Sequence, residues 1–282
     1  MPAPEPARQR RDGGPRDATA PPAPERLAVP VLDSHCHLDL IDGPVESTIA
    51  AAAAVGVTRL LTIGVDVASS RWSAEVAAAH DTVQAGVAIH PNEAPAHADE
   101  AALAEIERLA GLPQVRAVGE TGLDYYRTGP ADRPAQQESF RAHIDIAKRT
   151  GTALMIHDRE AHSDVLRILA ADGAPERVVF HCFSGDAEMA RACADLGYVM
   201  SFAGNVTFKN AADLREAAAA TPLDLLLVET DAPFLTPMPH RGRPNSPYLI
   251  PLTLRFLAEL KGVSADELCA AVTATANRVF GP

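Results

Sequence analysis

Short apolar segments alternate with alanine-rich segments of helical period along almost the whole chain. Apolar segments rich in β-branched residues predict strands, which we place at 31–36, 57–64, 83–89, 115–119, 152–156, 178–181, 198–202 and 225–228. The helical period predicts helices at about 45–55, 68–80, 99–110, 134–150, 160–171, 186–196, 209–220, 248–261 and 265–278. Strands that alternate with helices in this way pair in parallel.

The number and spacing of these elements predict an α/β fold of the (β/α)8 TIM-barrel type over residues 31–282. One strand and its helix recur about every 25–35 residues, and eight such units fill about 250 residues, the usual size of this barrel. A doubly wound open sheet is the alternative. It is disfavoured because no glycine-rich G-x-G-x-x-G turn follows the first predicted strand.

Residues 1–30 differ in composition from the rest of the chain. Proline and arginine are frequent there, and large apolar side chains are rare. Such a segment buries too little apolar surface to offset the entropy lost on ordering, so we expect a disordered leader before the barrel domain. No apolar stretch of a secretory signal follows Arg8, Arg10 and Arg11.

Composition limits the classes of function. No segment reaches the roughly 18 apolar residues of a membrane span, so we expect no membrane contact. The four cysteines have no paired spacing, which indicates reduced thiols and a cytoplasmic location. A net charge of -12 argues against a large sequence-independent DNA-binding face, although it permits a local basic cleft. No sequence feature indicates an obligatory protein partner.

Histidines and acids follow the carboxyl ends of six predicted strands. They are Asp33, His35, His37, His90, Glu120, Asp124, His157, His181, Glu229 and Asp231, with Arg159 beside them. In a (β/α)8 barrel these strand ends meet at one face, where active sites are found. The sequence therefore predicts one polar pocket built from segments far apart in the chain.

His35 and His37 are two residues apart at the end of the first strand, so both are expected to face the barrel mouth. Two neutral imidazoles suit one divalent ion of the zinc type. The alternative is a pair of hydrogen-bonded histidines without metal. Asp33 is expected on the same face, where it would orient a metal-bound imidazole. Cys36 faces the other way and is expected to pack against a helix.

Glu120 follows Gly119 and precedes Gly122, so the backbone can turn sharply there and the carboxylate can bridge two cations. A surface glutamate is the alternative. His157 and His181 end two apolar strands, where an ionisable group needs a partner. We expect them to share a metal, although buried hydrogen-bonded histidines would give the same pattern.

Asp231 follows the apolar run 225–228 and is the acid best placed to hold a metal and to take a proton from water. Helix N-capping is the alternative role. Four histidines and two acids together predict two divalent ions. Oxygen ligands favour magnesium or manganese, and imidazoles favour zinc.

Eight short motifs occur in one order along the barrel region. They are Asp-Ser-His-Cys-His-Leu-Asp at 33–39, Gly-Val-Ala-Ile-His-Pro at 86–91, Gly-Glu-Thr-Gly-Leu-Asp-Tyr at 119–125, His-Asp-Arg at 157–159, His-Cys-Phe-Ser-Gly at 181–185, Glu-Thr-Asp-Ala-Pro-Phe at 229–234, Arg-Gly-Arg-Pro-Asn at 241–245 and Asn-Arg-Val-Phe at 277–280. In these motifs the chain resembles the TatD family of metal-dependent hydrolases, within the amidohydrolase-like barrels. The leader lies outside the resemblance.

The resemblance implies specific roles at the mouth. One metal site is built by His35, His37 and Asp231, and a second by His157 and His181, with Glu120 between them. Asp231 positions or deprotonates the attacking water. A further set would contact substrate: His90 as a phosphate contact or proton donor, and Arg159, Arg241 and Arg243 as phosphate ligands. A solvated rim is the alternative for the arginines.

The resemblance also implies a substrate. Family members are similar to deoxyribonucleases that act as 3′→5′ exonucleases on single strands with divalent cations, so single-stranded DNA or a DNA 3′ end is expected. An ester or amide hydrolase, such as a D-aminoacyl-tRNA deacylase, would use the same ligands. A non-catalytic metal-binding scaffold is a third alternative, which the retention of all the ligands disfavours.

Overall fold

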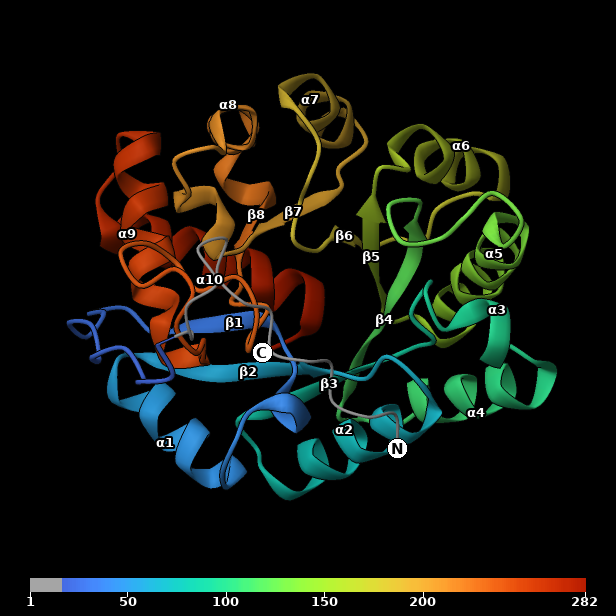
Figure 1. The fold of residues 1–282 in the computed structure, drawn as a ribbon, viewed down its shortest axis with the longest axis horizontal. Coiled ribbons are helices and arrows are strands. Elements are labelled where there is room, and N and C mark those ends of the chain that lie inside the picture. The colour runs from blue at the N-terminus through green and yellow to red at the C-terminus, as the bar shows by residue number, and fades with distance from the viewer. Residues whose placement is uncertain (1–16) are drawn as a thin grey trace.

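Eight strands form one parallel sheet whose order follows the chain from β1 to β8 (Figure 1). The structure is a computed structural model that describes residues 17–282. The strands are β1 Val31–Cys36, β2 Val57–Ile63, β3 Val83–Val87, β4 Val115–Asp124, β5 Ala153–Arg159, β6 Val178–Phe180, β7 Val199–Phe202 and β8 Leu226–Val228. All eight lie where the sequence predicts strands.

Helices surround the strands on the outside (Figure 1). They are α1 Val45–Ala54, α2 Val67–Ala79, α3 Ala94–His97, α4 Glu100–Ala110, α5 Arg133–Thr150, α6 His162–Asp172, α7 Ala187–Asp195, α8 Ala212–Ala220, α9 Ile250–Lys261 and α10 Ala265–Phe280. Side chains fix where several of them begin: Asp66, Asp99 and Asp186 each accept a hydrogen bond from a backbone N–H in the first turn. These caps satisfy amides that have no partner within the helix.

The last strand returns to the first and closes the sheet. Cys36 forms a parallel bridge with Ala232. His37 N–H donates to the Ala232 carbonyl over 2.8 Å, and Asp231 N–H donates to the His35 carbonyl over 2.9 Å. A doubly wound open sheet has no such contact between its first and last strands. The predicted (β/α)8 barrel is therefore confirmed.

Strand β4 is longer than predicted, since it continues from Gly119 to Asp124. Glycine commonly ends a strand, but here two glycines allow β4 to approach β5. A Cβ on Gly119 would lie 2.4 Å from the Met155 carbonyl oxygen, and one on Gly122 would lie 2.1 Å from that of His157. The β4–β5 register shifts between Val118 and Thr121, where Glu120 lies. This irregularity turns the Glu120 carboxylate into the barrel.

The interior of the barrel is packed with apolar side chains at the end opposite the mouth. Leu32, Leu61, Met155 and Leu227 lie within one buried cluster, and Phe280 at the end of α10 packs against it. The outer faces of the strands pack against the helices in a second, larger cluster. One end of the barrel is thus filled, which leaves the carboxyl ends of the strands for polar residues.

The packed part of the chain begins before the predicted boundary at residue 31. Leu27 is buried and donates its N–H to the Val55 carbonyl over 2.9 Å. Tyr248 donates its hydroxyl to the Pro21 carbonyl, and Arg255 donates to the Glu25 carbonyl. The predicted disorder of residues 1–30 thus does not hold for this segment, whose backbone carbonyls bind barrel side chains. Residues 1–16 of the predicted leader lie outside the described residues.

Within the described range, every helix is too short or too polar to cross a lipid bilayer.

Candidate metal centre at the barrel mouth

All six predicted metal ligands meet at the carboxyl ends of the strands. His35 lies in β1, Glu120 in β4 and His157 in β5. His37 directly follows β1, His181 directly follows β6, and Asp231 comes shortly after β8. Each comes from a separate strand end except the pair on β1. The closure of the barrel brings these distant segments together.

The first group of donor atoms consists of His35, His37 and Asp231. The two imidazole Nε2 atoms are 3.3 Å apart, and Asp231 Oδ1 lies 3.8 Å and 3.5 Å from them. Ligand atoms about 2.1 Å from one tetrahedral ion lie about 3.4 Å from one another. The spacing of this group therefore fits a single divalent cation.

The second group surrounds one oxygen of Glu120. Its Oε1 lies 2.6 Å from His157 Nδ1 and 2.8 Å from His181 Nε2, and these two nitrogens are 3.4 Å apart. His90 Nε2 approaches the same oxygen at 3.4 Å. His157 and His181 therefore lie together, as predicted. His90, which was expected to contact substrate, also lies directly beside this pair.

Glu120 joins the two groups. Its second oxygen, Oε2, lies 3.5 Å from His35 Nε2 and 3.8 Å from His37 Nε2. The rings of His35 and His181, one from each group, stack with their centroids 3.9 Å apart. One carboxylate therefore faces both groups, as a bridge between two cations does.

On three of the four ligand histidines the ring nitrogen that faces away from the centre is held by an oxygen atom, whereas His35 Nδ1 lies 3.1 Å from Met155 Sδ. His37 Nδ1 lies 3.1 Å from the Ile63 carbonyl, His181 Nδ1 3.2 Å from Glu229 Oε1, and His157 Nε2 3.2 Å from Asp124 Oδ2. A proton on each of these nitrogens directs the lone pair of the other nitrogen to the centre. Glu229 and Asp124 follow predicted strands, and this position at the strand ends was the only sequence signal for their role.

Asp33 does not orient a metal-bound imidazole, which corrects the expectation from strand alternation. Its carboxylate accepts hydrogen bonds from the Thr230 N–H, the Thr230 hydroxyl and the His35 N–H. The β1–β2 register shifts between Asp33 and Cys36, so alternation does not hold through this stretch. Asp33 instead fixes the segment that carries Asp231. Cys36 packs in the outer apolar cluster, as predicted.

Carboxylates and imidazoles at the centre shift the pKa values of one another. Burial alone would lower the His37 pKa, but Asp231 and Glu120 outweigh burial and raise that pKa to about 9. Burial acts likewise on His181, yet Glu120 and Glu229 hold its pKa well above the ordinary value. Conversely, His181 and His90 outweigh burial and hold the Glu120 pKa well below its usual range. Carboxylates packed around imidazoles in this way favour cations between them.

The hydrogen bonds of His90 define which of its ring nitrogens carries the proton. Its Nδ1 accepts a hydrogen bond from the Asn92 N–H over 3.1 Å, so Nε2 carries the proton in the neutral ring. Burial lowers the His90 pKa, which keeps the ring neutral. The Nε2–H points toward Glu120. This arrangement makes His90 a hydrogen-bond donor at the centre.

The three arginines expected to contact phosphate lie in different surroundings. Arg159 stacks on Tyr126, with its guanidinium carbon 3.8 Å from the ring centroid. Arg241 stacks on Phe208. Arg243 donates to the carbonyls of Thr19 and Ala20 and pairs with Asp17 at 3.3 Å. Their roles in substrate binding stay predictions.

One ligand, Asp231, and one residue next to a ligand, Cys182, adopt left-handed backbone conformations. Asp231 has a φ of 52°, and Cys182, which follows His181, has a φ of 40°. Side chains other than glycine rarely adopt such values, and they persist where surrounding contacts hold them. The Cys182 N–H donates to Glu229 Oε1 over 2.8 Å, and the Asp231 N–H is bound to His35. The fold therefore imposes these conformations at the centre.

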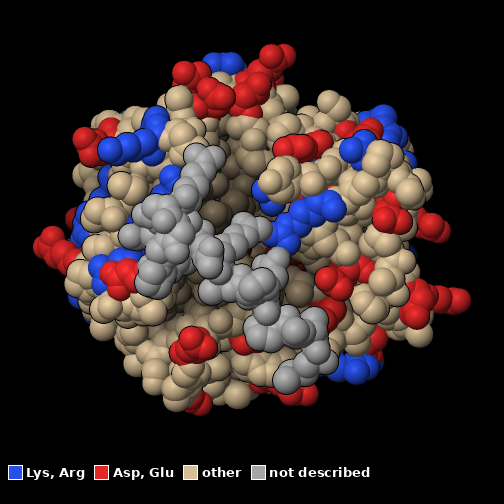
Figure 2. Space-filling view, viewed as in Figure 1, with Lys and Arg blue, Asp and Glu red and all other residues tan. Residues whose placement is uncertain are grey.

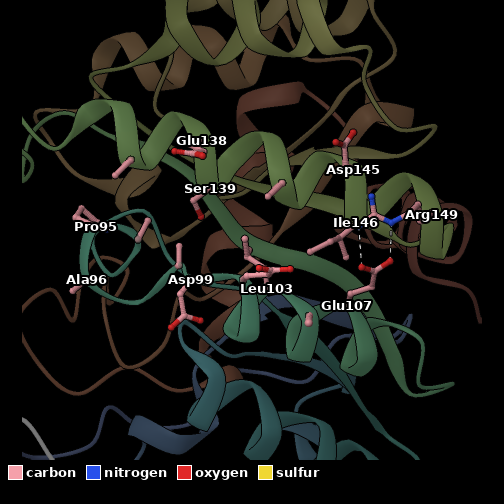
Figure 3. A pocket seen from close by; sticks show the side chains of 16 residues that line it. Pro95, Ala96, Asp99, Leu103, Glu107, Glu138, Ser139, Asp145, Ile146 and Arg149 are labelled. Atoms are coloured by element: carbon pink, nitrogen blue, oxygen red, sulfur yellow. Dashed lines mark hydrogen bonds and ion pairs between the residues drawn. The ribbon is translucent and has the colours of Figure 1, made fainter.

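The surface around the barrel axis is hollowed. A hollow lies near the middle of the face in Figure 2, with Lys and Arg side chains beside it and acidic side chains mainly at the periphery. A separate cavity of about 750 Å³ lies on the outside of the barrel between α3, α4 and α5 (Figure 3). Glu107, Glu138, Asp145 and Arg149 line it, and none of the ligand residues does. This outer cavity is therefore not part of the metal centre.

Comparisons with known proteins identify the family of this chain. The family model described as TatD related DNase matches residues 32–281. An uncharacterized metal-dependent hydrolase, TatD of Mycobacterium tuberculosis, is 49% identical over 259 residues, which cover 89% of this chain and 98% of that protein. The uncharacterized metal-dependent hydrolase YcfH of Escherichia coli K12 is 39% identical over 256 residues, covering 89% and 95%.

Solved structures show the same architecture. The crystal structure of YJJV, a TatD homolog from Escherichia coli K12, superposes with a TM-score of 0.84 at 28% identity and covers 89% of this chain and 98% of that one. The chain therefore belongs to the TatD-related DNase family of metal-dependent hydrolases.

Proposed function

We propose that the protein is a deoxyribonuclease that removes nucleotides from the 3′ end of single-stranded DNA with two divalent cations. The observation that carries the proposal is the position of Glu120, whose two oxygens face two separate groups of histidines. A pair of cations a few ångströms apart suits in-line displacement at a phosphodiester. The DNase description of the matching family supports the same reaction.

The residues fit the cations that the family requires. His35, His37 and Asp231 would hold one, His157 and His181 the other, and Glu120 would contact both. The donors are imidazole and carboxylate, which are compatible with magnesium, manganese or zinc. When bound, such cations supply positive charge that polarises a phosphoryl oxygen and lowers the pKa of water.

The chain's own residues position and move protons. Asp231 Oδ1 lies at the mouth beside His35 and His37, where it can accept a proton from the attacking water. His90 Nε2–H can donate a hydrogen bond to a phosphate oxygen, but its neutral ring has no second proton to give to the leaving oxygen. Asp33 and Glu229 hold Thr230 and His181 in place.

Arg159 is the arginine best placed to bind the phosphate. Ala153 and Met155 on β5 fill the barrel interior, and alternation places His157 and then Arg159 further along the same face. Arg159 therefore lies about 6–7 Å beyond His157 toward solvent. No carboxylate in residues 17–282 forms an ion pair with it. Its N–H groups are available for a phosphate fork.

The charge of the molecule favours a short substrate contact. A net charge of -12 opposes a long nucleic-acid interface, so we expect the protein to hold a strand end. We place the reaction in the cytoplasm. The four cysteines support this location because all are free thiols, the usual state in a reducing compartment.

The test uses metal-stripped protein re-supplied with magnesium, manganese or zinc. Single-stranded DNA labelled at its 3′ end is compared with the same oligonucleotide labelled at its 5′ end, beside a D-aminoacyl-tRNA. Asp231→Asn is the inactive variant, and His80→Ala is the matched control, because His80 precedes β3 at the opposite end of the barrel.

Three outcomes are distinguishable. Early release of the 3′ label as a mononucleotide, with a ladder of shortened 5′-labelled products, supports 3′→5′ hydrolysis when it needs metal and is lost in Asp231→Asn. Cleavage of the aminoacyl ester alone overturns the DNA assignment and leaves the hydrolase. No reaction with either substrate overturns both and favours a non-catalytic role.

A further inference from the structure

Large apolar side chains are exposed at the mouth of the barrel. In residues 17–282 these exposed side chains are Leu40, Tyr126, Leu196 and Phe234, each 50–59% accessible. Three of the four follow strands β1, β4 and β8 at their carboxyl ends. Leu196 is the exception, since it ends α7 before β7 at the opposite end. Scattered exposed apolar residues are ordinary, but a concentration around one site marks a binding surface.

Phe234 is a rigid part of this surface beside the first group of ligands. Its ring lies edge-to-face with that of His37, at a centroid distance of 6.0 Å and an angle of 72°. Its N–H donates to the Asp231 carbonyl over 2.8 Å, and its carbonyl accepts a hydrogen bond from the Asn245 side chain. The backbone is therefore fixed, while half of the side chain faces solvent.

Tyr126 lies beside the second group. It follows Asp124, whose carboxylate contacts His157, and the turn is held by the Arg127 N–H on Asp124 Oδ1. The Arg159 guanidinium covers one face of the Tyr126 ring. Tyr126 is 58% exposed, so much of its side chain is accessible to a base. Stacking on the ring also leaves the in-plane N–H groups of Arg159 free to bind phosphate.

We propose that Phe234 and Tyr126 are the stacking residues that hold the two bases on either side of the scissile phosphodiester, Phe234 at the His37 side and Tyr126 at the His157 side. The inference rests on the proposed nuclease function. Any base can stack on an aromatic ring, so the contact accepts all sequences. The guanidinium beside Tyr126 supplies the charge that the phosphate between the bases requires.

The first experiment measures stacking without hydrolysis. A single-stranded oligonucleotide with 2-aminopurine at its last or penultimate 3′ position is titrated onto metal-stripped protein in EDTA, and quenching of the 2-aminopurine reports stacking. We expect Phe234→Ala and Tyr126→Ala each to weaken binding about 5- to 100-fold and to remove quenching at one of the two positions. Phe234→Leu keeps apolar area without a ring and should resemble Phe234→Ala. Tyr126→Phe and Leu196→Ala should bind as the unmodified protein does.

The second experiment separates base stacking from a structural effect. The KM for metal-loaded protein is compared on oligonucleotides with a normal or an abasic 3′-terminal or penultimate nucleotide. We expect the abasic substrate to raise KM for the unmodified protein, and the matching alanine variant to show no further rise on it. A general loss of structure would lower activity on both substrates alike.

The outcomes distinguish this inference from the proposed function. Hydrolysis of DNA with unchanged binding and quenching in both alanine variants overturns the stacking role and leaves the nuclease. Quenching that depends on Phe234 and Tyr126, without hydrolysis by the unmodified protein, supports the stacking role and overturns the nuclease. No binding or quenching by the unmodified protein overturns the inference.

Discussion

The backbone N–H of Asp231 donates a hydrogen bond to the carbonyl oxygen of His35 over 2.9 Å. This contact joins the end of β8 to β1 and places Asp231 Oδ1 within 3.8 Å of the Nε2 atoms of both His35 and His37. The same interaction thus closes the barrel and completes the first group of metal ligands. Geometry needed for the fold and geometry needed for the chemistry coincide at this point.

Substitution Asp231→Asn should leave the fold intact and lower kcat by about 10²- to 10⁴-fold, because the amide cannot accept a proton from water. The Asp231 N–H bond to His35 does not involve the side chain, so barrel closure is retained. Turnover on metal-loaded protein and a thermal melt check the two parts. Near-normal turnover would refute the assigned role of Asp231.

The double substitution His35→Ala and His37→Ala should remove one bound divalent ion per chain, since both Nε2 atoms of the first group are lost. The metal content of dialysed protein, measured by mass spectrometry, checks this. His80→Ala is the control and should keep the full content. A double variant with the same metal content as the unmodified protein would contradict ligation by these residues.

Substitution Glu229→Gln should weaken metal binding about 10- to 100-fold without unfolding the protein. Glu229 Oε1 lies 3.2 Å from His181 Nδ1 and accepts the Cys182 N–H. An amide oxygen still accepts a hydrogen bond but carries no charge to support the imidazole. Competition with a chelator measures the affinity. Equal metal affinity in both proteins would show that the negative charge of Glu229 beside His181 does not affect metal binding.

Folding stability should fall as the pH drops from about 6.5 to about 4, in part through His143. This fully buried ring lies with Nδ1 2.7 Å from the Ser139 carbonyl and accepts the Ile89 N–H at Nε2. Burial lowers its pKa to about 4. Because the unfolded chain binds a proton there near pH 6.5, up to about 3 kcal/mol of unfolding free energy is lost across this window.

Urea unfolding at several pH values, for the unmodified protein and for His143→Gln, measures the contribution of His143. The variant lacks the titrating ring, so its unfolding free energy should depend less on pH between 4 and 6.5. The difference between the two pH profiles isolates His143 from other titrating groups. Parallel profiles would assign the acid sensitivity to other residues.

Much of the site follows from patterns that are local in the chain. His35 and His37 were assigned together because of their spacing on one strand, and Glu120 because glycines flank it. The structure brings these three residues together at one centre. Local patterns were misleading where the strands are irregular. The shift in β1 redirects Asp33 to Thr230, and the close approach of β4 to β5 extends β4 to Asp124.

The barrel can be predicted from the amino-acid sequence, since the period of apolar residues specifies strands and helices and their alternation specifies parallel pairing. The sequence also placed the six ligand residues at the strand ends. The three-dimensional contacts were needed to show that Asp124 holds His157, that Glu229 holds His181, that Arg243 binds Asp17 and that Arg159 stacks on Tyr126. These are contacts between residues far apart in the chain. They depend on how the closed sheet places neighbouring strands and loops in space, which no local period records.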